Sequence, residues 1–294
     1  MQNRILLMND LPGIGRAALN MMLPILTQMG AEPVCLPTAL LSNTLNFGEA
    51  AILDTTEYLE QAAEKWKELG TGFDGVMTGF ILHERQAEWI ADFCKKQREQ
   101  GAVIFCDPIL GDHGRLYRGI TQSRVECMKR IVRESRYVLP NYTEACYLTG
   151  RPYCPDPTER EIHSVLQDLT DLGARAVILK SVYGEGHYRV YGFDAETGQQ
   201  FTCPYEALPV NYSGTGDAFA ALFAGKLLAG EKLEHSVRYA VDTVRAMIER
   251  NVRLGHTGFL YESCLDLVQI QIVDEYRHNI TISLVDRDRR SGVK

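Results

Sequence analysis

The sequence predicts an α/β fold, a three-layer sandwich in which helices cover both faces of a mostly parallel sheet. Three observations lead to this prediction. Short apolar runs alternate with longer amphipathic stretches along most of the 294 residues. No repeat, low-complexity tract or Pro/Gly-rich linker divides the chain, so a single domain over residues 1–285 is expected, followed by a charged tail at 286–294. The composition, 45% hydrophobic and 23% charged, is that of an ordinary globular protein.

The apolar runs have the length of buried strands, and the stretches between them have helical periodicity. Strands are expected at residues 4–8, 33–36, 75–78, 102–106, 137–139 and 176–179, with a hairpin formed by 188–191 and 200–203 around a turn at 194–198. Helices are expected at 15–29, 55–69, 84–100, 121–135 and 158–172, and then near 216–229 and 233–253. Strands that alternate with helices in this way pair in parallel through crossover connections.

Charge and cysteine usage narrow the classes of function. The net charge of −7 argues against a nucleic-acid binder, which needs a basic face. No segment approaches the roughly 20 apolar residues that span a bilayer, and the first ten residues do not form a signal peptide, so no membrane partner is expected. Eight cysteines without a CxxC pair predict reduced, mostly buried thiols in a cytoplasmic protein. The seven histidines form no zinc-binding cluster.

The most informative segment is Ser213–Asp217, which precedes an apolar helical pattern. Its two glycines allow a tight turn, and the first N–H groups of a helix bind phosphate oxygens well. Asp217 has two readings. It is an ordinary residue for a helix start, and beside a phosphate site its carboxylate could instead remove the proton from an attacking hydroxyl.

Four motifs together resemble the pyridoxal kinase branch of the ribokinase-like kinases. SGTGDAF, from Ser213, resembles the C-terminal signature of that superfamily. CDPILGD from Cys106, with GRLY from Gly114, resembles the DPVxGD…GxLY segment of the branch. LPNYTEA from Leu139, followed by LTG, resembles TPNxxEAxxLTG, and TALLSN from Thr38 resembles TxxxSN. The motifs occur in the family's order and span most of the chain, so the resemblance implies a ribokinase-like fold.

The resemblance implies transfer of the ATP γ-phosphoryl group to the 5′-hydroxymethyl group of a vitamin B6 vitamer by a homodimer. Asp217 would be the catalytic base. The implied roles of the other residues are an anion hole at Gly214, Thr215 and Gly216; nucleotide binding by Asp107, Asn141, Lys180 and Ser181; and metal binding by Asp107, Asp112 and Glu144. Two carboxylates beside a polyphosphate repel it unless cations intervene, so Mg²⁺ is expected, with K⁺ as a second candidate cation.

Each of these positions also has a structural reading. Asp107 and Asp112 could be solvated loop residues, and Glu144 could be a first-turn helix carboxylate favoured by the helix dipole. Lys180 could be an exposed charge at a strand end, or it could neutralise the charge on a transferred phosphoryl group.

The acceptor side is expected near the first two strands, where the resemblance assigns Asn9, Asp10, Thr38 and Ser42 to the substrate. Residues 13–18 read GIGRAA, which also resembles the dinucleotide-binding fingerprint of Rossmann dehydrogenases. Asp10 and Pro12 crowd that turn, and the other motifs favour the kinase.

Three departures from the pyridoxal kinase pattern keep alternatives open. Leu139 replaces a common Thr, and Lys180 stands where that branch often has Thr and hydroxymethylpyrimidine kinases more usually have Lys. Residues 44–47, TLNF, lack the His and Gly of the branch. The acceptor could therefore be a hydroxymethylpyrimidine or another small alcohol, and a catalytically weak vitamer-binding protein is the alternative from a different class.

Overall fold

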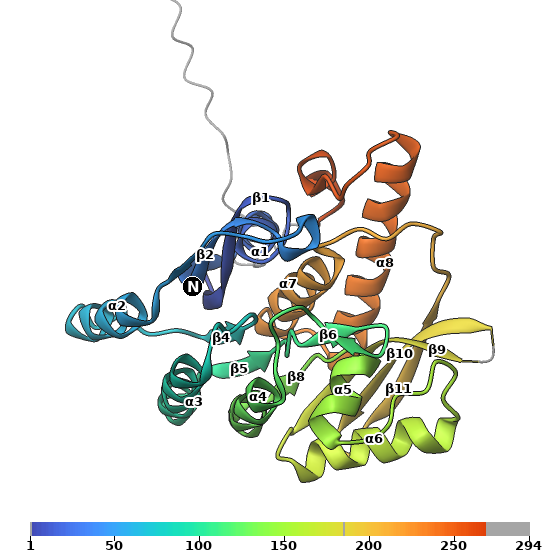
Figure 1. The fold of residues 1–294 in the computed structure, drawn as a ribbon, viewed down its shortest axis with the longest axis horizontal. Helices are drawn as coiled ribbons and strands as arrows, with labels where there is room; N and C mark the ends of the chain where they lie inside the picture. The colour runs from blue at the N-terminus through green and yellow to red at the C-terminus, as the bar shows by residue number, and fades with distance from the viewer. Residues whose placement is uncertain (1, 185, 269–294) are drawn as a thin grey trace, which may run out of the picture.

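The computed structural model describes residues 2–184 and 186–268. Its strands are β1 (Arg4–Ile14), β2 (Glu32–Asn43), β3 (Ile52–Asp54), β4 (Gly75–Thr78), β5 (Val103–Cys106), β6 (Gly111–Asp112), β7 (Arg115–Leu116), β8 (Tyr137–Val138), β9 (Ala176–Gly184), β10 (His187–Asp194) and β11 (Gln200–Tyr205). Nine of them form one sheet in the order β11-β10-β9-β8-β5-β4-β1-β2-β3, and β6 pairs only with β7 (Figure 1). The six strands from β9 to β2 in this order are parallel, whereas β10, β11 and β3 are antiparallel to their neighbours.

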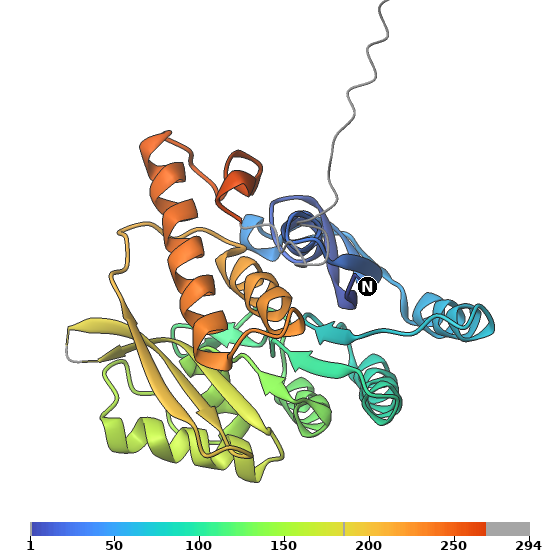
Figure 2. The same cartoon turned by 180° about the vertical axis from the view of Figure 1, so that it is seen from behind.

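Helices cover both faces of this sheet. They are α1 (Leu19–Gln28), α2 (Thr56–Glu68), α3 (Glu84–Glu99), α4 (Gln122–Glu134), α5 (Tyr142–Thr149), α6 (Glu159–Asp171), α7 (Thr215–Leu228) and α8 (Leu233–Arg253), with short 3₁₀ turns η1 (Leu45–Phe47), η2 (Tyr261–Ser263) and η3 (Leu265–Leu267). Helices α1, α7 and α8 pack on one face and α2 to α6 on the other, each over its own hydrophobic cluster (Figures 1 and 2). The three-layer prediction is confirmed.

The first two strands are longer than the sequence indicates. Strand β1 continues past Met8 to Ile14 and pairs with β2 as far as Asn43, through a bulge between Asn9 and Leu11. Helix α1 consequently begins at Leu19 rather than near residue 15. Residues 13–15 therefore do not form the tight strand-to-helix turn of a dinucleotide-binding fingerprint.

The sequence also predicts the state of the cysteines, the absence of a membrane span and the end of the domain. The eight cysteines are unpaired, and six of them are buried, which agrees with the prediction of reduced thiols. Within residues 2–184 and 186–268, no helix has the length and apolar character that a bilayer crossing requires. The predicted end of the domain at residue 285 and the tail at 286–294 lie outside the described residues.

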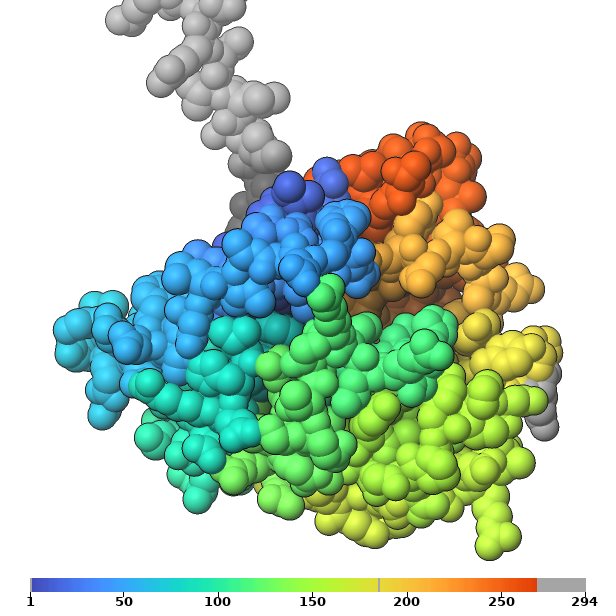
Figure 3. Space-filling model, in the orientation of Figure 1, coloured from blue at the N-terminus to red at the C-terminus, as the bar shows by residue number. Residues whose placement is uncertain are grey.

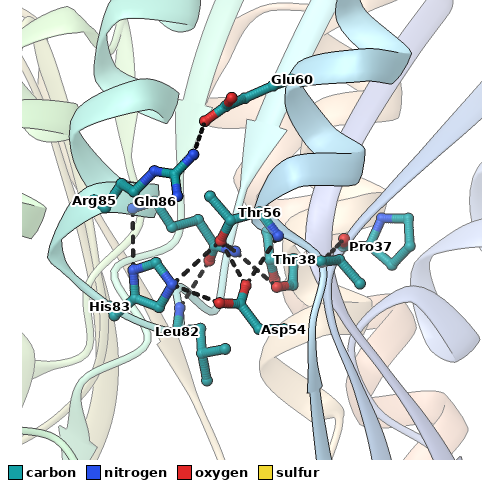
Figure 4. Close-up of polar contacts among 10 residues, drawn as sticks. Pro37, Thr38, Asp54, Thr56, Glu60, Leu82, His83, Arg85 and Gln86 are labelled. Carbon is teal, nitrogen blue, oxygen red and sulfur yellow. Dashed lines mark hydrogen bonds and ion pairs between the residues drawn. The ribbon is translucent and has the colours of Figure 1, made fainter.

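A buried polar cluster joins β2 and β3 to α2 and α3 (Figure 4). Gln86, fully buried at the start of α3, donates to Thr38 O (2.8 Å) and Thr56 Oγ1 (3.1 Å) and accepts from Leu82 N (2.8 Å). His83 Nδ1 accepts from Gln86 N (3.2 Å), so its Nε2–H is free to donate to Asp54 Oδ2 (2.9 Å). The amide of Gln86 thus satisfies backbone groups that no other side chain of the cluster reaches.

We expect Gln86→Ala to lower the free energy of unfolding by about 2–4 kcal/mol, because it leaves a cavity and unpairs Leu82 N–H and Thr38 C=O. Lys95→Ala, at an exposed position of the same helix, should change it by less than about 0.5 kcal/mol. Urea unfolding followed by circular dichroism measures both. Equal stability of the two variants would show that the cluster does not hold these elements together.

Candidate active site

The polar residues identified in the sequence meet at the carboxyl ends of neighbouring strands. Asn9 lies in β1, Asp107 follows β5, Asn141 follows β8, and Lys180 lies in β9. Asp217, in the first turn of α7, reaches the same edge of the sheet from the helical layer, where Asn9 contacts it. Figure 3 shows a recess at this edge, bordered by the blue N-terminal segment, the green segment after β5 and the gold segment before α7.

The carboxylate of Asp217 is held by two donors from the N-terminal part of the chain. Ala18 N donates to Oδ2 (2.9 Å), and Asn9 Nδ2 donates to Oδ1 (3.3 Å). Burial, together with the charge of Asp107, raises the pKa of Asp217 to about 6, although the two hydrogen bonds and the charge of Lys180 oppose the rise. A carboxylate with such a pKa is ionised at neutral pH and is a better proton acceptor than an ordinary aspartate.

Asn9 is buried and uses both ends of its amide within the protein. Its Oδ1 accepts from Phe80 N (2.7 Å) and Asp10 N (3.0 Å), which orients Nδ2 toward Asp217. The assignment of Asn9 to the substrate remains a prediction, and the contacts seen here are those of a residue that positions Asp217.

The segment before α1 packs tightly against the segment before α7. Ala18, which donates to Asp217, has φ of 51°, an unusual value for a residue with a side chain. Gly214 has φ of 89°, and a Cβ at this position would lie 2.3 Å from Arg16 O. Only glycine fits there, so the turn before α7 can approach the segment that holds Asp217.

The N-terminus of α7 presents backbone N–H groups to the recess. The first helical hydrogen bond runs from Ala218 N to Gly214 O (2.9 Å), so the N–H groups of residues 215–217 precede the helical ladder. The Thr215 hydroxyl donates to Tyr212 O (3.2 Å) and stabilises the turn. An anion bound to these N–H groups would meet the positive end of a 14-residue helix, and the anion hole at Gly214, Thr215 and Gly216 stays a prediction.

Lys180 and Asp107 form a buried ion pair. Lys180 Nζ lies 2.9 Å from Oδ1 and 2.8 Å from Oδ2 of Asp107, and their side chains are 11% and 8% exposed. Burial alone would lower the pKa of Lys180, but the charges of Asp107 and Glu144 raise it above its ordinary value. The ammonium is therefore charged at neutral pH, and its reading as an exposed strand-end charge is wrong.

The strand that carries Lys180 does not end at Leu179, as the sequence suggests. Strand β9 continues to Gly184, and Lys180 and Ser181 together oppose the single residue Val190 of β10, which is a β-bulge. Ser181 has φ of 56°, and its Oγ accepts from Tyr205 OH (3.2 Å). The bulge turns Lys180 toward Asp107 and Ser181 toward the neighbouring pocket described below.

Asn141 and Glu144 form a capping box at the start of α5. Glu144 N donates to Asn141 Oδ1 (2.9 Å), Asn141 N donates to Glu144 Oε2 (2.7 Å), and Leu110 N donates to Glu144 Oε1 (3.2 Å). Burial and the charge of Asp107 hold the pKa of Glu144 well above its usual range. Asn141 Nδ2 donates to Gly111 O (2.8 Å) and fixes the loop after β5. The helix-start reading of Glu144 is thus confirmed, and its role near a metal stays a prediction.

The predicted metal ligands do not form a ready-made site. Asp107 binds Lys180 through both oxygens, and Glu144 binds backbone N–H groups. Asp112 lies at the half-exposed rim, where its Oδ1 accepts from His113 N (2.8 Å). No group of three His, Cys, Asp or Glu residues in the described ranges is arranged to hold a metal ion.

The four predicted acceptor residues have different environments. Asp10 is buried next to Asp217, and its pKa is raised to about 7 by burial and by the charge of Asp217. Thr38 is fully buried and donates to Phe80 O (2.7 Å), so it supports the loop that Asn9 also binds. Ser42 is exposed and accepts from Ala51 N (2.9 Å), which stabilises the connection to β3. Among these, Asp10 is the residue with a titratable group beside Asp217.

The segment that departs from the family pattern, residues 44–47, lies against the phosphate-facing turn. Asn46 Nδ2 donates to Ser213 Oγ, and the Phe47 ring is 69% exposed. Gly15 must be glycine to allow this, because it has φ of 112° and a Cβ there would lie 2.4 Å from the Thr44 side chain. This segment therefore borders the recess on the acceptor side.

A pocket beside the N-terminus of α7 was missed by the sequence analysis. It has a volume of about 180 Å³ and extends from Lys180, Thr215 and Gly216 to a largely apolar wall. The wall is formed by Val190, Phe219, Val241, Val244 and Ile248, with Tyr205, Glu206 and Arg245 among the polar residues that line it. Its shape and lining suit a planar aromatic ring whose attached phosphates would reach the helix N-terminus. In the sequence, the apolar residues that line this pocket have the same helical spacing as residues of the hydrophobic core, so the pocket could not be recognised.

Besides this pocket, the sequence analysis assigned no role to Tyr117. Burial raises its pKa, and the charges of Glu144, Asp112, Asp107 and Asp217 raise it further, so its hydroxyl remains protonated near these carboxylates. Tyr117 is the last residue of the GRLY motif, and this motif is the sequence feature that could have identified it as a site residue.

Known proteins similar to this chain share its fold and motifs. The sequence family described as phosphomethylpyrimidine kinase matches residues 23–261. A pyridoxal kinase of Rubrobacter xylanophilus is 28% identical over 245 residues, which cover 78% of this chain and 81% of that protein.

Solved structures of proteins described as phosphomethylpyrimidine kinase or pyridoxal kinase also match this chain. A Bacteroides thetaiotaomicron protein described as a phosphomethylpyrimidine kinase matches with a TM-score of 0.87 and 32% identity over 92% of this chain and 96% of that chain. A second crystal form of that protein was solved with pyridoxal. The pyridoxal kinase of Lactobacillus plantarum matches with a TM-score of 0.82 and 29% identity over 91% of this chain and 97% of that chain.

We expect Asn9→Leu to move the pKa of Asp217 upward from about 6, because the variant loses a hydrogen bond that favours the ionised form. Carboxyl ¹³C NMR titration measures this pKa, with Asp217→Asn to identify the signal. Asn20→Leu removes a bond to Pro12 O (2.6 Å) in the same region without touching Asp217, and should leave the pKa unchanged. An unaltered titration in Asn9→Leu would contradict the positioning role of Asn9.

Proposed function

The chain belongs to the phosphomethylpyrimidine kinase family, within the ribokinase-like small-molecule kinases, and we propose that it transfers the γ-phosphoryl group of ATP to the 5′-hydroxymethyl group of a vitamin B6 vitamer. The observation that carries this proposal is the position of Asp217. Its carboxylate has a raised pKa and lies one turn from a helix N-terminus that can bind phosphate. Relatives named pyridoxal kinase support the choice of acceptor.

In this proposal Asp217 accepts the proton of the acceptor hydroxyl as that oxygen attacks the γ-phosphorus. Ala18 N and Asn9 hold the carboxylate in place, so little reorganisation is needed during proton transfer. The N–H groups of residues 215–217 and the Lys180 ammonium stabilise the negative charge on the transferring phosphoryl oxygens.

The pocket between β9, β10, α7 and α8 would hold the nucleotide base. Val190, Phe219 and Val244 offer an apolar surface to the ring, and the pocket opens onto Gly216 and Lys180, where the phosphates would lie. Ser181, turned toward this pocket by the bulge in β9, is a nucleotide contact in the proposal.

Magnesium fits this site only as a partner of the nucleotide. It would be held mainly by phosphate oxygens and water, with Asp112 at the rim as the available carboxylate and Asp107 and Glu144 already bonded. When bound, it would neutralise charge on the phosphates.

A hydroxymethylpyrimidine is the second candidate acceptor. The family description and Lys180 favour it, whereas the CDPILGD and GRLY segments favour a B6 vitamer. Both acceptors are aromatic ring alcohols, so the same transfer chemistry serves either. A catalytically weak vitamer-binding protein, the alternative from another class, would not need the raised pKa of Asp217.

We also propose that the protein is a cytoplasmic homodimer. Among the residues that the structure describes, no strand pairs with the outer edge of β3, and Leu40, Ile52 and Leu53 expose 37%, 48% and 60% of their surface beside it. An exposed apolar edge strand is usually covered by a partner. The eight unpaired cysteines suit a reducing compartment.

We expect Asp217→Asn to lower turnover at least about 100-fold while nucleotide binding persists, because the base is lost and the anion hole remains. Coupled ADP-release assays with pyridoxal, pyridoxine, pyridoxamine and hydroxymethylpyrimidine measure turnover and rank the acceptors. In the wild type, activity should fall as pH drops below about 6, since only the ionised carboxylate accepts a proton. Near-normal turnover of the variant would remove Asp217 as the base, and absence of turnover with every ring alcohol would remove the acceptor assignment.

We expect Leu53→Lys to convert the homodimer to a monomer, because it places a charge in the apolar edge that the partner would cover. Light scattering after size-exclusion chromatography measures the mass. Leu69→Lys, at a 76% exposed position after α2, is the matched control and should leave the dimer intact. A monomeric wild type would contradict the proposal directly.

A further inference from the structure

The ion pair between Lys180 and Asp107 bears on the second cation that the sequence resemblance implies. We propose that the Lys180 ammonium occupies the position of a bound monovalent cation at Asp107, so that this protein binds its nucleotide and reacts without K⁺. The inference rests on the proposed function, because it concerns how the nucleotide phosphates are neutralised.

The surroundings of Asp107 do not fit a potassium ion. A monovalent cation needs a cage of oxygen atoms that replace its water shell. Both oxygens of Asp107 are already bonded to Lys180 at 2.8 and 2.9 Å. The neighbouring strand end contributes Leu139, which is fully buried, aliphatic, and fixed beside Cys106 by a hydrogen bond from its N to Cys106 O (2.8 Å). Lys180 therefore already holds both carboxylate oxygens that an ion at Asp107 would need, and Leu139 has no side-chain oxygen to offer.

The ammonium is a permanent part of this site. Asp107 and Lys180 are both nearly excluded from solvent, and a buried carboxylate is costly unless a positive charge pairs with it. The pair therefore carries its own counter-charge in the absence of any ion.

Lys180 can also face the nucleotide while it binds Asp107. An ammonium has three N–H donors, and the two oxygens of Asp107 leave capacity for a further acceptor. A Cβ built on Gly216 would lie 3.8 Å from Lys180 Nζ, which places the ammonium beside the N-terminus of α7. A phosphate bound there would therefore meet the helix N–H groups and a covalently attached cation together.

The first test compares the wild-type protein in KCl and in tetramethylammonium chloride at equal ionic strength. Phosphorylation of the best acceptor should differ by less than about two-fold, since the required positive charge is built in. The rise in thermal midpoint caused by MgADP should likewise be the same in both salts. Activation by K⁺ of about ten-fold or more would overturn the proposal.

The second test removes the ammonium. Lys180→Thr should lose at least about 100-fold in activity in tetramethylammonium chloride and regain about ten-fold or more in KCl, because Asp107 is then free to bind the ion. Its MgADP-induced rise in thermal midpoint should become larger in KCl. Lys226→Met removes another buried lysine, which packs 4.4 Å over the Tyr239 ring, and should respond equally to both salts. A Lys180→Thr protein that ignores K⁺ in both measurements would overturn the proposal.

These measurements separate the inference from the proposed function. If no acceptor is phosphorylated, the proposed function fails, and the MgADP thermal shift of the wild type still decides whether K⁺ is needed. If Lys180→Thr does not fold, the wild-type comparison decides alone, with independence of K⁺ supporting the inference and about ten-fold activation opposing it.

Discussion

Four carboxylates share one edge of the sheet, and the site depends on keeping them close despite their mutual repulsion. Asp107 is paired with Lys180, Glu144 accepts backbone N–H groups, Asp217 accepts an amide and a backbone N–H, and the pKa of Asp10 is raised. Their partners come from β1 and β9, from the loop after β5, and from the residues that precede α1 and α5. The strand order therefore determines both the packing of the sheet and which partner stabilises each carboxylate.

Much of the fold could be predicted because its signal is local. Apolar runs and amphipathic stretches predicted the starts of the parallel strands and the positions of seven helices, whereas β1, β2 and β9 extend beyond their predicted ends. The extension of β1 could not be predicted, since Asp10, Pro12 and Gly13 are turn-forming residues by local preference. Pairing with β2 across a bulge outweighs that preference, and only the tertiary structure contains that information.

Site residues that belong to a sequence motif could be predicted. Contacts between residues far apart in the sequence could not. The motifs correctly place Asp107 after β5 and Asp217 at the start of α7. The bond between Lys180 and Asp107 joins residues 73 positions apart, and no sequence pattern specifies it. The family resemblance assigns Asn9 to the substrate, whereas its side chain donates to Asp217. The pocket beside α7 could not be predicted, because its wall has the same composition as a hydrophobic core.

One face of the sheet is covered by helices from both ends of the chain, α1 near the start and α7 and α8 near the end. During synthesis the strands emerge long before the last two of these helices, so the nascent sheet has an uncovered apolar face until translation is almost complete. Asp217 and the Ala18 N–H that binds it are 199 positions apart, so a chain that ends before residue 217 lacks this contact. A chain that terminates before α7 would therefore keep this apolar face exposed and would be prone to aggregate.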